Sequence, residues 1–134
     1  MRPDEEEHVT IVVGYLPTAE GNAALEAAIV EARRRGSRLL VLFSQRRGDD
    51  FAVIEEKLEA VRDRLDSAEL GYDVRVSESG DVADDLIDAA TQVDADLIVI
   101  GLRRRSPVGK LILGSNAQRI LLDAPTPVLA VKSA

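Results

Sequence analysis

Five short apolar segments alternate with four stretches of helical periodicity, and this alternation limits the possible folds more than any other feature of the chain. The apolar segments are rich in Val, Ile and Leu, and they cover residues 8–15, 38–44, 72–78, 96–101 and 127–132. Three of them are nearly continuous, which is typical of strands buried on both faces of a parallel sheet. Residues 72–78 instead alternate between apolar and polar side chains, which predicts an edge strand with one solvent-facing side.

Each of the four intervening stretches places its apolar residues on one side of a helix. The predicted faces are Leu25, Ala28, Ile29 and Ala32; Ile54, Leu58, Val61 and Leu65; Val82, Leu86, Ala89, Ala90 and Val93; and Ala117, Ile120, Leu121 and Ala124. Strands that alternate with helices require right-handed crossovers and helices on both faces of one sheet. We therefore predict an α/β fold, a doubly wound five-stranded and mainly parallel sheet, as a single domain over residues 1–134.

Turn and capping residues mark the ends of these helices. Gly36 and Gly71 follow the first and second helical stretches, and two prolines close the fourth. Side chains able to cap helix N-termini precede the second stretch at Asp49 or Asp50, and the third at Ser79 or Asp81.

The formal net charge of −7 argues against a general nucleic-acid-binding protein, because the overall field repels a polyanion. The chain has no cysteine, which excludes disulfides, thiolate metal sites and thiol nucleophiles. Acidic residues at positions 4–7 do not fit a secretory leader, and no segment approaches the ~18 apolar residues of a membrane span. We therefore expect a cytoplasmic protein.

The segment GLRRRSPVGKLILGS, residues 101–115, follows the fourth predicted strand and carries the clearest signal for a ligand. In an open parallel sheet, ligands bind beyond the carboxyl ends of the strands where the strand order reverses. The segment is not a P-loop, because Arg104 stands where the first glycine belongs and Leu111 where the magnesium-binding hydroxyl belongs. The loop GYLPTAEG, after the first strand, also lacks the dinucleotide-binding G-x-G-x-x-G pattern.

Gly114, Ser115 and Asn116 stand at a predicted helix start, where free N–H groups and the positive end of the helix dipole favour an anion. The simpler interpretation is that Ser115 only caps the helix. Arg103, Arg105 and Lys110 raise the local positive potential, although solvated loop charges would give the same pattern.

The succession of elements, and residues 94–132 above all, resembles the universal stress protein family. Nucleotide-binding members of that family carry G-x2-G-x9-G-[ST] after the fourth strand. Here Gly101 opens the pattern, nine residues separate position 104 from Gly114, and Ser115 follows. The resemblance also covers TIVVGY near the start, SGDVADDLIDAA before the third helix and PVLAVK at the end.

This resemblance implies a site for an adenine nucleotide. Gly101 and Gly114 match glycines that let the backbone approach ribose and phosphates, and Ser115 matches a phosphate-binding residue. Ser44 matches the residue whose backbone reads the adenine edge. The remaining candidates are Gly14 and Tyr15 beside the base or ribose, Ile100 in the adenine pocket, Asn116 and Ala117 at the helix start, and Arg104, Gly109 and Lys110 in the loop.

Two residues depart from the pattern of ATP-binding members. Leu16 replaces an acidic residue after the first strand, so the ribose hydroxyls lose a hydrogen-bond acceptor. Arg104 replaces the middle glycine, and its guanidinium either occludes the phosphate site or clamps the phosphates in a bidentate manner.

The resemblance predicts a stress-response module that binds ATP, with Mg²⁺ on the phosphates and at most slow hydrolysis. It also implies a homodimer in which the last strands pair, burying Val128 and Val131. The alternative is a dimeric family member that binds no nucleotide and acts through protein interactions. An enzyme of another kind is disfavoured, because the single histidine, His8, has no partner for a catalytic triad or metal cluster, and the acids at Asp81–Asp88 suit helix capping.

Overall fold

A computed structural model describes residues 10–44, 48, 50–77, 80–103 and 114–133 of the chain. Strands and helices alternate throughout these residues. In chain order the elements are β1 (Thr10–Tyr15), α2 (Ala19–Arg35), β2 (Arg38–Ser44), α3 (Phe51–Ser67), β3 (Tyr72–Ser77), α4 (Val82–Gln92), β4 (Leu97–Leu102), α5 (Ser115–Asp123) and β5 (Val128–Lys132). Each predicted strand and helix is therefore present.

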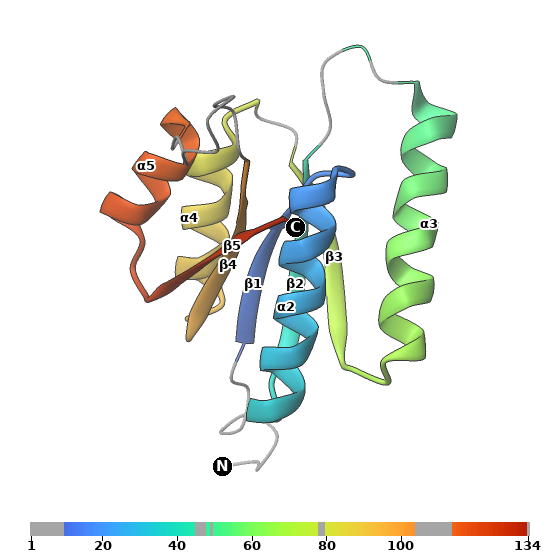
Figure 1. Cartoon of the computed structure of the whole chain (residues 1–134), viewed down its shortest axis with the longest axis horizontal. Helices are drawn as coiled ribbons and strands as arrows, with labels where there is room; N and C mark the ends of the chain where they lie inside the picture. Colours follow the sequence, from blue (N-terminus) through green and yellow to red (C-terminus); the bar gives the residue numbers. More distant parts are fainter. Residues whose placement is uncertain (1–9, 45–47, 49, 78–79, 104–113, 134) are drawn as a thin grey trace.

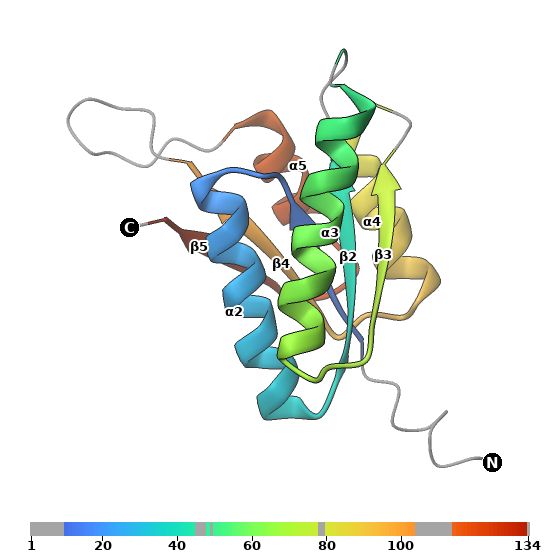
Figure 2. The same cartoon turned by 90° about the vertical axis from the view of Figure 1, so that its right-hand side faces the viewer.

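The five strands form one sheet in the order β3-β2-β1-β4-β5, and every pairing in it is parallel. Helices α2 and α3 lie on one face of the sheet, and α4 and α5 lie on the other (Figures 1 and 2). This arrangement confirms the predicted doubly wound α/β fold. The strand order reverses between β1 and β4, so the carboxyl ends of these two strands border the crevice where such sheets bind ligands.

Side chains that alternate along each central strand fill two separate cores. Along β1, Ile11 and Val13 pack under α2 and α3, whereas Val12 packs under α4 and α5. This explains why β1, β2 and β4 are nearly continuous apolar runs, since both of their faces are covered. The predicted helix faces are buried or partly buried with one exception: Leu121 is 41% exposed, because Ile120 takes the inward position on the short helix α5.

The two edge strands of the sheet, β3 and β5, differ in how their side chains are exposed. The edge strand β3 has alternating exposed and partly buried residues up to Val76, as predicted. At the opposite edge, β5 is only partly buried along its length, and Leu129 is 36% exposed. The apolar strand β5 therefore has no cover from the described residues on its outer side.

The capping predictions were mostly accurate. The side chain of Asp50 caps α3 by accepting a hydrogen bond from the backbone N–H of Ala52. The side chain of Asp81 caps α4 by accepting a hydrogen bond from the backbone N–H of Asp84. Gly36 ends α2 in the left-handed conformation. The expectation for Gly71 was wrong, because α3 stops at Ser67 and the left-handed residue that follows it is Glu69, at φ 59°.

Two glycines let the first turn of α2 lie against the ends of β1 and β4. A Cβ on Gly21 would stand 1.7 Å from the carbonyl oxygen of Leu16, and one on Gly101 would stand 2.2 Å from the carbonyl oxygen of Glu20. Both distances are far shorter than any real contact, so neither position accepts a larger residue without movement of the backbone. The same turn is tied to β4 by an ion pair between Arg103 and Glu20, at 3.6 Å. Close packing here fixes the loop that borders the crevice.

Candidate functional site

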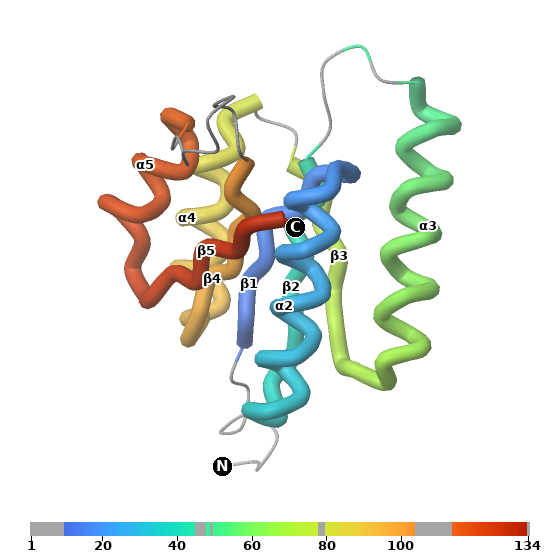
Figure 3. Tube along the Cα trace, viewed as in Figure 1, coloured from blue at the N-terminus to red at the C-terminus, as the bar shows by residue number. Residues whose placement is uncertain are grey.

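A hollow of about 140 Å³ lies at the carboxyl ends of the central strands, beside the point where the strand order reverses. Figure 3 shows the chain segments that meet there, namely the ends of β1, β2 and β4 and the first turns of α4 and α5. The lining residues are Gly14, Tyr15, Leu16, Ser44, Val82, Leu86, Ile100, Gly101, Asn116, Ala117 and Ile120. The wall is mainly apolar, which suits a flat heterocycle more than a charged group.

Seven of the twelve candidate residues from the sequence line this hollow: Gly14, Tyr15, Ser44, Ile100, Gly101, Asn116 and Ala117. Gly114 and Ser115 are not among its lining residues, but they begin the helix that carries Asn116 and Ala117. The other three, Arg104, Gly109 and Lys110, lie outside the described residues.

Sequence reasoning did not assign Val82, Leu86 and Ile120 to the site. Helical periodicity marked all three as core residues, and Leu86 and Ile120 are indeed almost fully buried. They reach the hollow because α4 and α5 begin at its level. Periodicity identifies the buried face of a helix, but it does not show which residues on that face border a pocket.

Gly14 and Tyr15 face opposite sides of the sheet, so they contribute differently to the hollow. A Cβ on Gly14 would point to the α4 side and lie 3.3 Å from Leu86. Because Gly14 has no side chain, the backbone at the end of β1 is open to the hollow. The ring of Tyr15 points to the α2 side, where it packs 5.6 Å from the ring of Phe43 and donates a hydrogen bond to Asn22. Burial raises the pKa of Tyr15 above its ordinary value of 10.0. Tyr15 therefore offers the hollow its backbone and not its hydroxyl.

Ser44, the last residue of β2, carries an unmet hydrogen-bonding group. Its side chain is 2% exposed, and its hydroxyl has no hydrogen-bond partner among the described residues. An unsatisfied buried polar group costs about 1–3 kcal/mol. A ligand with polar atoms at the end of β2 would relieve this cost.

The N-terminus of α5 is uncapped by any side chain of the described residues. The N-cap is Gly114, so the simpler interpretation of Ser115 as the cap was wrong: Ser115 is the first residue of the helix itself. Gly114 has φ −69° and ψ 168°, an extended conformation open to any residue, and a Cβ there would meet no described atom within 4 Å. Neither backbone strain nor crowding among the described residues explains this glycine. The first-turn N–H groups of α5 have no partner within the helix itself and carry the positive end of its dipole.

Arg119 fixes α5 against the start of α4. Its guanidinium donates to Asp81, at 3.0 Å, and also to Asp84, and both acids stand in the first turn or cap of α4. The acids predicted to cap α4 therefore also hold the neighbouring helix. The described residues contain no group of three or more His, Cys, Asp or Glu side chains arranged to hold a metal ion.

Gly101 has a role in packing in addition to the role that the sequence motif implies. Its missing side chain makes room for the carbonyl of Glu20 on the α2 side, whereas the hollow lies on the α4 side. Gly101 nevertheless lines the hollow through its backbone. The packing of α2 therefore requires a glycine at this position, independently of any contact with a ligand.

The sequence matches the family model for the universal stress protein family over residues 8–132. The chain belongs to this family. A universal stress protein of Mycolicibacterium smegmatis is 42% identical over 126 residues, which cover 91% of this chain and 96% of that protein. The family resemblance stated from the motif is therefore confirmed.

Two solved universal stress protein structures contain adenine nucleotides. One, from Archaeoglobus fulgidus in complex with dAMP, has a TM-score of 0.73 and 29% identity, covering 93% of this chain and 98% of that one. Another, in complex with cAMP, has a TM-score of 0.76 and 26% identity, covering 95% of this chain and 98% of that one. Within the part of this family member that the structure describes, no helix is long and apolar enough to cross a membrane.

Proposed function

We propose that this universal stress protein binds an adenine nucleotide, with the base in the hollow beside Gly14 and Ile100 and the phosphates toward the N-terminus of α5. The observation that carries the proposal is the position of the uncapped α5 terminus directly beside an apolar hollow at the sheet's switch point. The dAMP and cAMP complexes of related proteins support the same class of ligand.

The residues present fit such a ligand in three respects. The apolar wall of Val82, Leu86 and Ile100 suits a purine ring, and the unmet hydroxyl of Ser44 offers a hydrogen bond at the end of β2. The first-turn amides of α5 favour an anion. Because the hollow of about 140 Å³ is smaller than the ~300 Å³ typical of the smallest ligand pockets, we place only the base inside it.

ATP with Mg²⁺ on its phosphates is the specific nucleotide that we propose, and the ligand would act as a regulatory signal. We expect at most slow hydrolysis, because none of the described residues that line the hollow presents an acidic or histidine side chain as a general base. Leu16 also lines the hollow, and its apolar side chain offers no acceptor to the ribose. We therefore expect binding to depend mainly on the base and the phosphates.

Calorimetric titration with ATP and Mg²⁺ tests this function in the wild type and in Arg104→Gly. If the arginine clamps the phosphates, the wild type binds and the variant binds at least about tenfold more weakly, since a charge-assisted bidentate pair contributes on the order of 1.5–3 kcal/mol. Binding by the variant alone would mean that Arg104 occludes an intact nucleotide site. Binding by neither protein contradicts the proposal and favours a family member that acts through protein interactions.

We also propose that the protein forms a homodimer through β5. The support is an edge strand whose apolar residues Val128, Leu129 and Val131 are only partly buried in the single chain. An apolar edge left unpaired favours association with another strand.

In sedimentation experiments we expect a dimer for the wild type and a monomer for Leu129→Lys, which places a charge on this edge. A monomeric wild type, or a variant that remains dimeric, would contradict this interface.

A further inference from the structure

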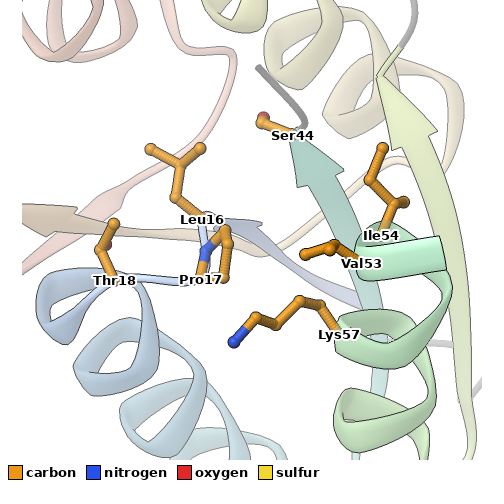
Figure 4. A pocket seen from close by; sticks show the side chains of 7 residues that line it. All are labelled: Leu16, Pro17, Thr18, Ser44, Val53, Ile54 and Lys57. Atoms are coloured by element: carbon orange, nitrogen blue, oxygen red, sulfur yellow. The ribbon is translucent and has the colours of Figure 1, made fainter. Parts of the chain in front are cut away.

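A second pocket, of about 300 Å³, lies on the other side of the Leu16 loop from the proposed nucleotide site. Figure 4 shows its lining: Leu16, Pro17 and Thr18 from the loop between β1 and α2, Ser44 from the end of β2, and Val53, Ile54 and Lys57 from α3. Among the described lining residues, the two pockets share only Leu16 and Ser44. Its volume is at the lower end of the range for small-molecule sites, which is ~300–1,000 Å³.

Apolar side chains form most of this second pocket. Leu16 and Pro17 stand on one side of it, and Val53 points toward them from the first turn of α3, while the side chain of Ile54 lies beside the end of β2 (Figure 4). Val53 is 48% exposed, because it lies beside the inward face of α3 and not on it, and its side chain borders the pocket instead of the core. Apolar surface that remains open to water in this way favours an apolar ligand.

Lys57 gives the pocket its only cationic group among the described lining residues. Its amino group extends toward the loop at Pro17 and Thr18 (Figure 4). Within the described residues it has no salt bridge, although other exposed basic residues such as Arg34, Arg64 and Arg119 each pair with an acid. Its helical neighbours three and four positions away are Val53, Ile54, Ala60 and Val61, so α3 itself supplies no acidic partner at pairing distance.

We propose that this pocket binds a short aliphatic carboxylate. The alkyl chain would lie between Leu16 and the side chains of Val53 and Ile54, and the carboxylate would pair with the ammonium of Lys57. An ionised carboxylate supplies a partner to Lys57, which has no salt bridge among the described residues, and an alkyl chain of a few carbons covers the apolar walls. Val53, Ile54 and Lys57, which would hold the ligand, do not line the nucleotide hollow, so the proposal does not depend on nucleotide binding.

The length of the ligand tests the apolar part of the site. Burial of each methylene strengthens binding by about fourfold, so hexanoate, with two more methylenes, should bind about fifteenfold more tightly than butanoate in a titration followed by NMR. The methyl signals of Val53 and Ile54 should shift together with those of Leu16. Equal affinities for the two acids, or shifts that gather around Ile100 and Ala117 instead, would overturn the assignment of the pocket.

The charge of Lys57 is tested with a neutral ligand and a matched variant. Wild-type protein should prefer hexanoate over 1-hexanol by about fivefold, the upper range for an exposed ion pair, and Lys57→Gln should remove this preference. Lys132→Gln makes the same charge change on β5, and it should leave the preference intact. Because Lys57 is exposed, its replacement should not unfold the protein. No preference in the wild type, or equal effects of the two variants, would overturn the proposal.

Discussion

Gly21→Ala is expected to lower the free energy of unfolding by about 3 kcal/mol, at the upper end of the range for overpacking. The added methyl group would stand 1.7 Å from the carbonyl oxygen of Leu16, a backbone atom that a side-chain rotation cannot move. Alanine has a better helix propensity than glycine by about 1 kcal/mol, but this gain is smaller than the expected cost of the clash. Urea denaturation followed by circular dichroism measures the difference.

Gly114→Ala is the matched control for this substitution. It also adds one methyl group at the start of a helix, but at an extended residue where the methyl group would meet no described atom within 4 Å. Its effect on unfolding should stay below about 1 kcal/mol, the typical difference between residues at an N-cap. If Gly21→Ala is as stable as Gly114→Ala, the first turn of α2 does not pack against the Leu16 loop as described.

Ala117→Leu should weaken binding of AMP by at least about tenfold. Ala117 lines the hollow from the first turn of α5, and the three added carbons would occupy space that we assign to the base. Leucine has a high helix propensity, and a side chain that fills an existing space does not carry the cost of overpacking a filled core. Calorimetry with AMP should therefore report a loss of affinity in a protein whose thermal unfolding is nearly unchanged.

Gln118→Leu provides the control for the added leucine. It introduces the same side chain into the same helix, one residue further on, at an exposed position that does not line the hollow. The affinity for AMP should stay within about twofold of the wild type, since a difference of a few tenths of a kcal/mol is typical of a distant surface change. Wild-type affinity in Ala117→Leu would show that the base does not enter this hollow.

Periodicity alone was enough to predict the fold of this chain. The continuous apolar runs at β1, β2 and β4 indicated strands covered on both faces, and the alternation at β3 indicated an edge. These predictions succeeded because a parallel sheet that is sandwiched between helices leaves few other ways to bury such runs. The exposed position of Leu121 was missed, since a nine-residue helix covers the sheet with only part of its apolar face.

The geometry at the crevice depends on contacts between distant segments, and these were harder to predict. The sequence motif could not show that Gly101 accommodates the carbonyl of Glu20, because that contact joins β4 to α2. It also could not show that α5 begins one residue earlier than a serine cap would require. The second pocket had no sequence signal, since Leu16, Val53 and Lys57 come together only when α3 packs beside the Leu16 loop.

Amide NMR with added AMP tests the central claim most directly, namely that an adenine nucleotide binds where the strand order reverses. The account predicts that the perturbed signals of the wild-type protein gather at Gly14, Ser44, Ile100 and Ala117, from four separate elements that meet only at this hollow. An unchanged spectrum at millimolar AMP, or perturbations confined to the edge strands β3 and β5, would contradict it.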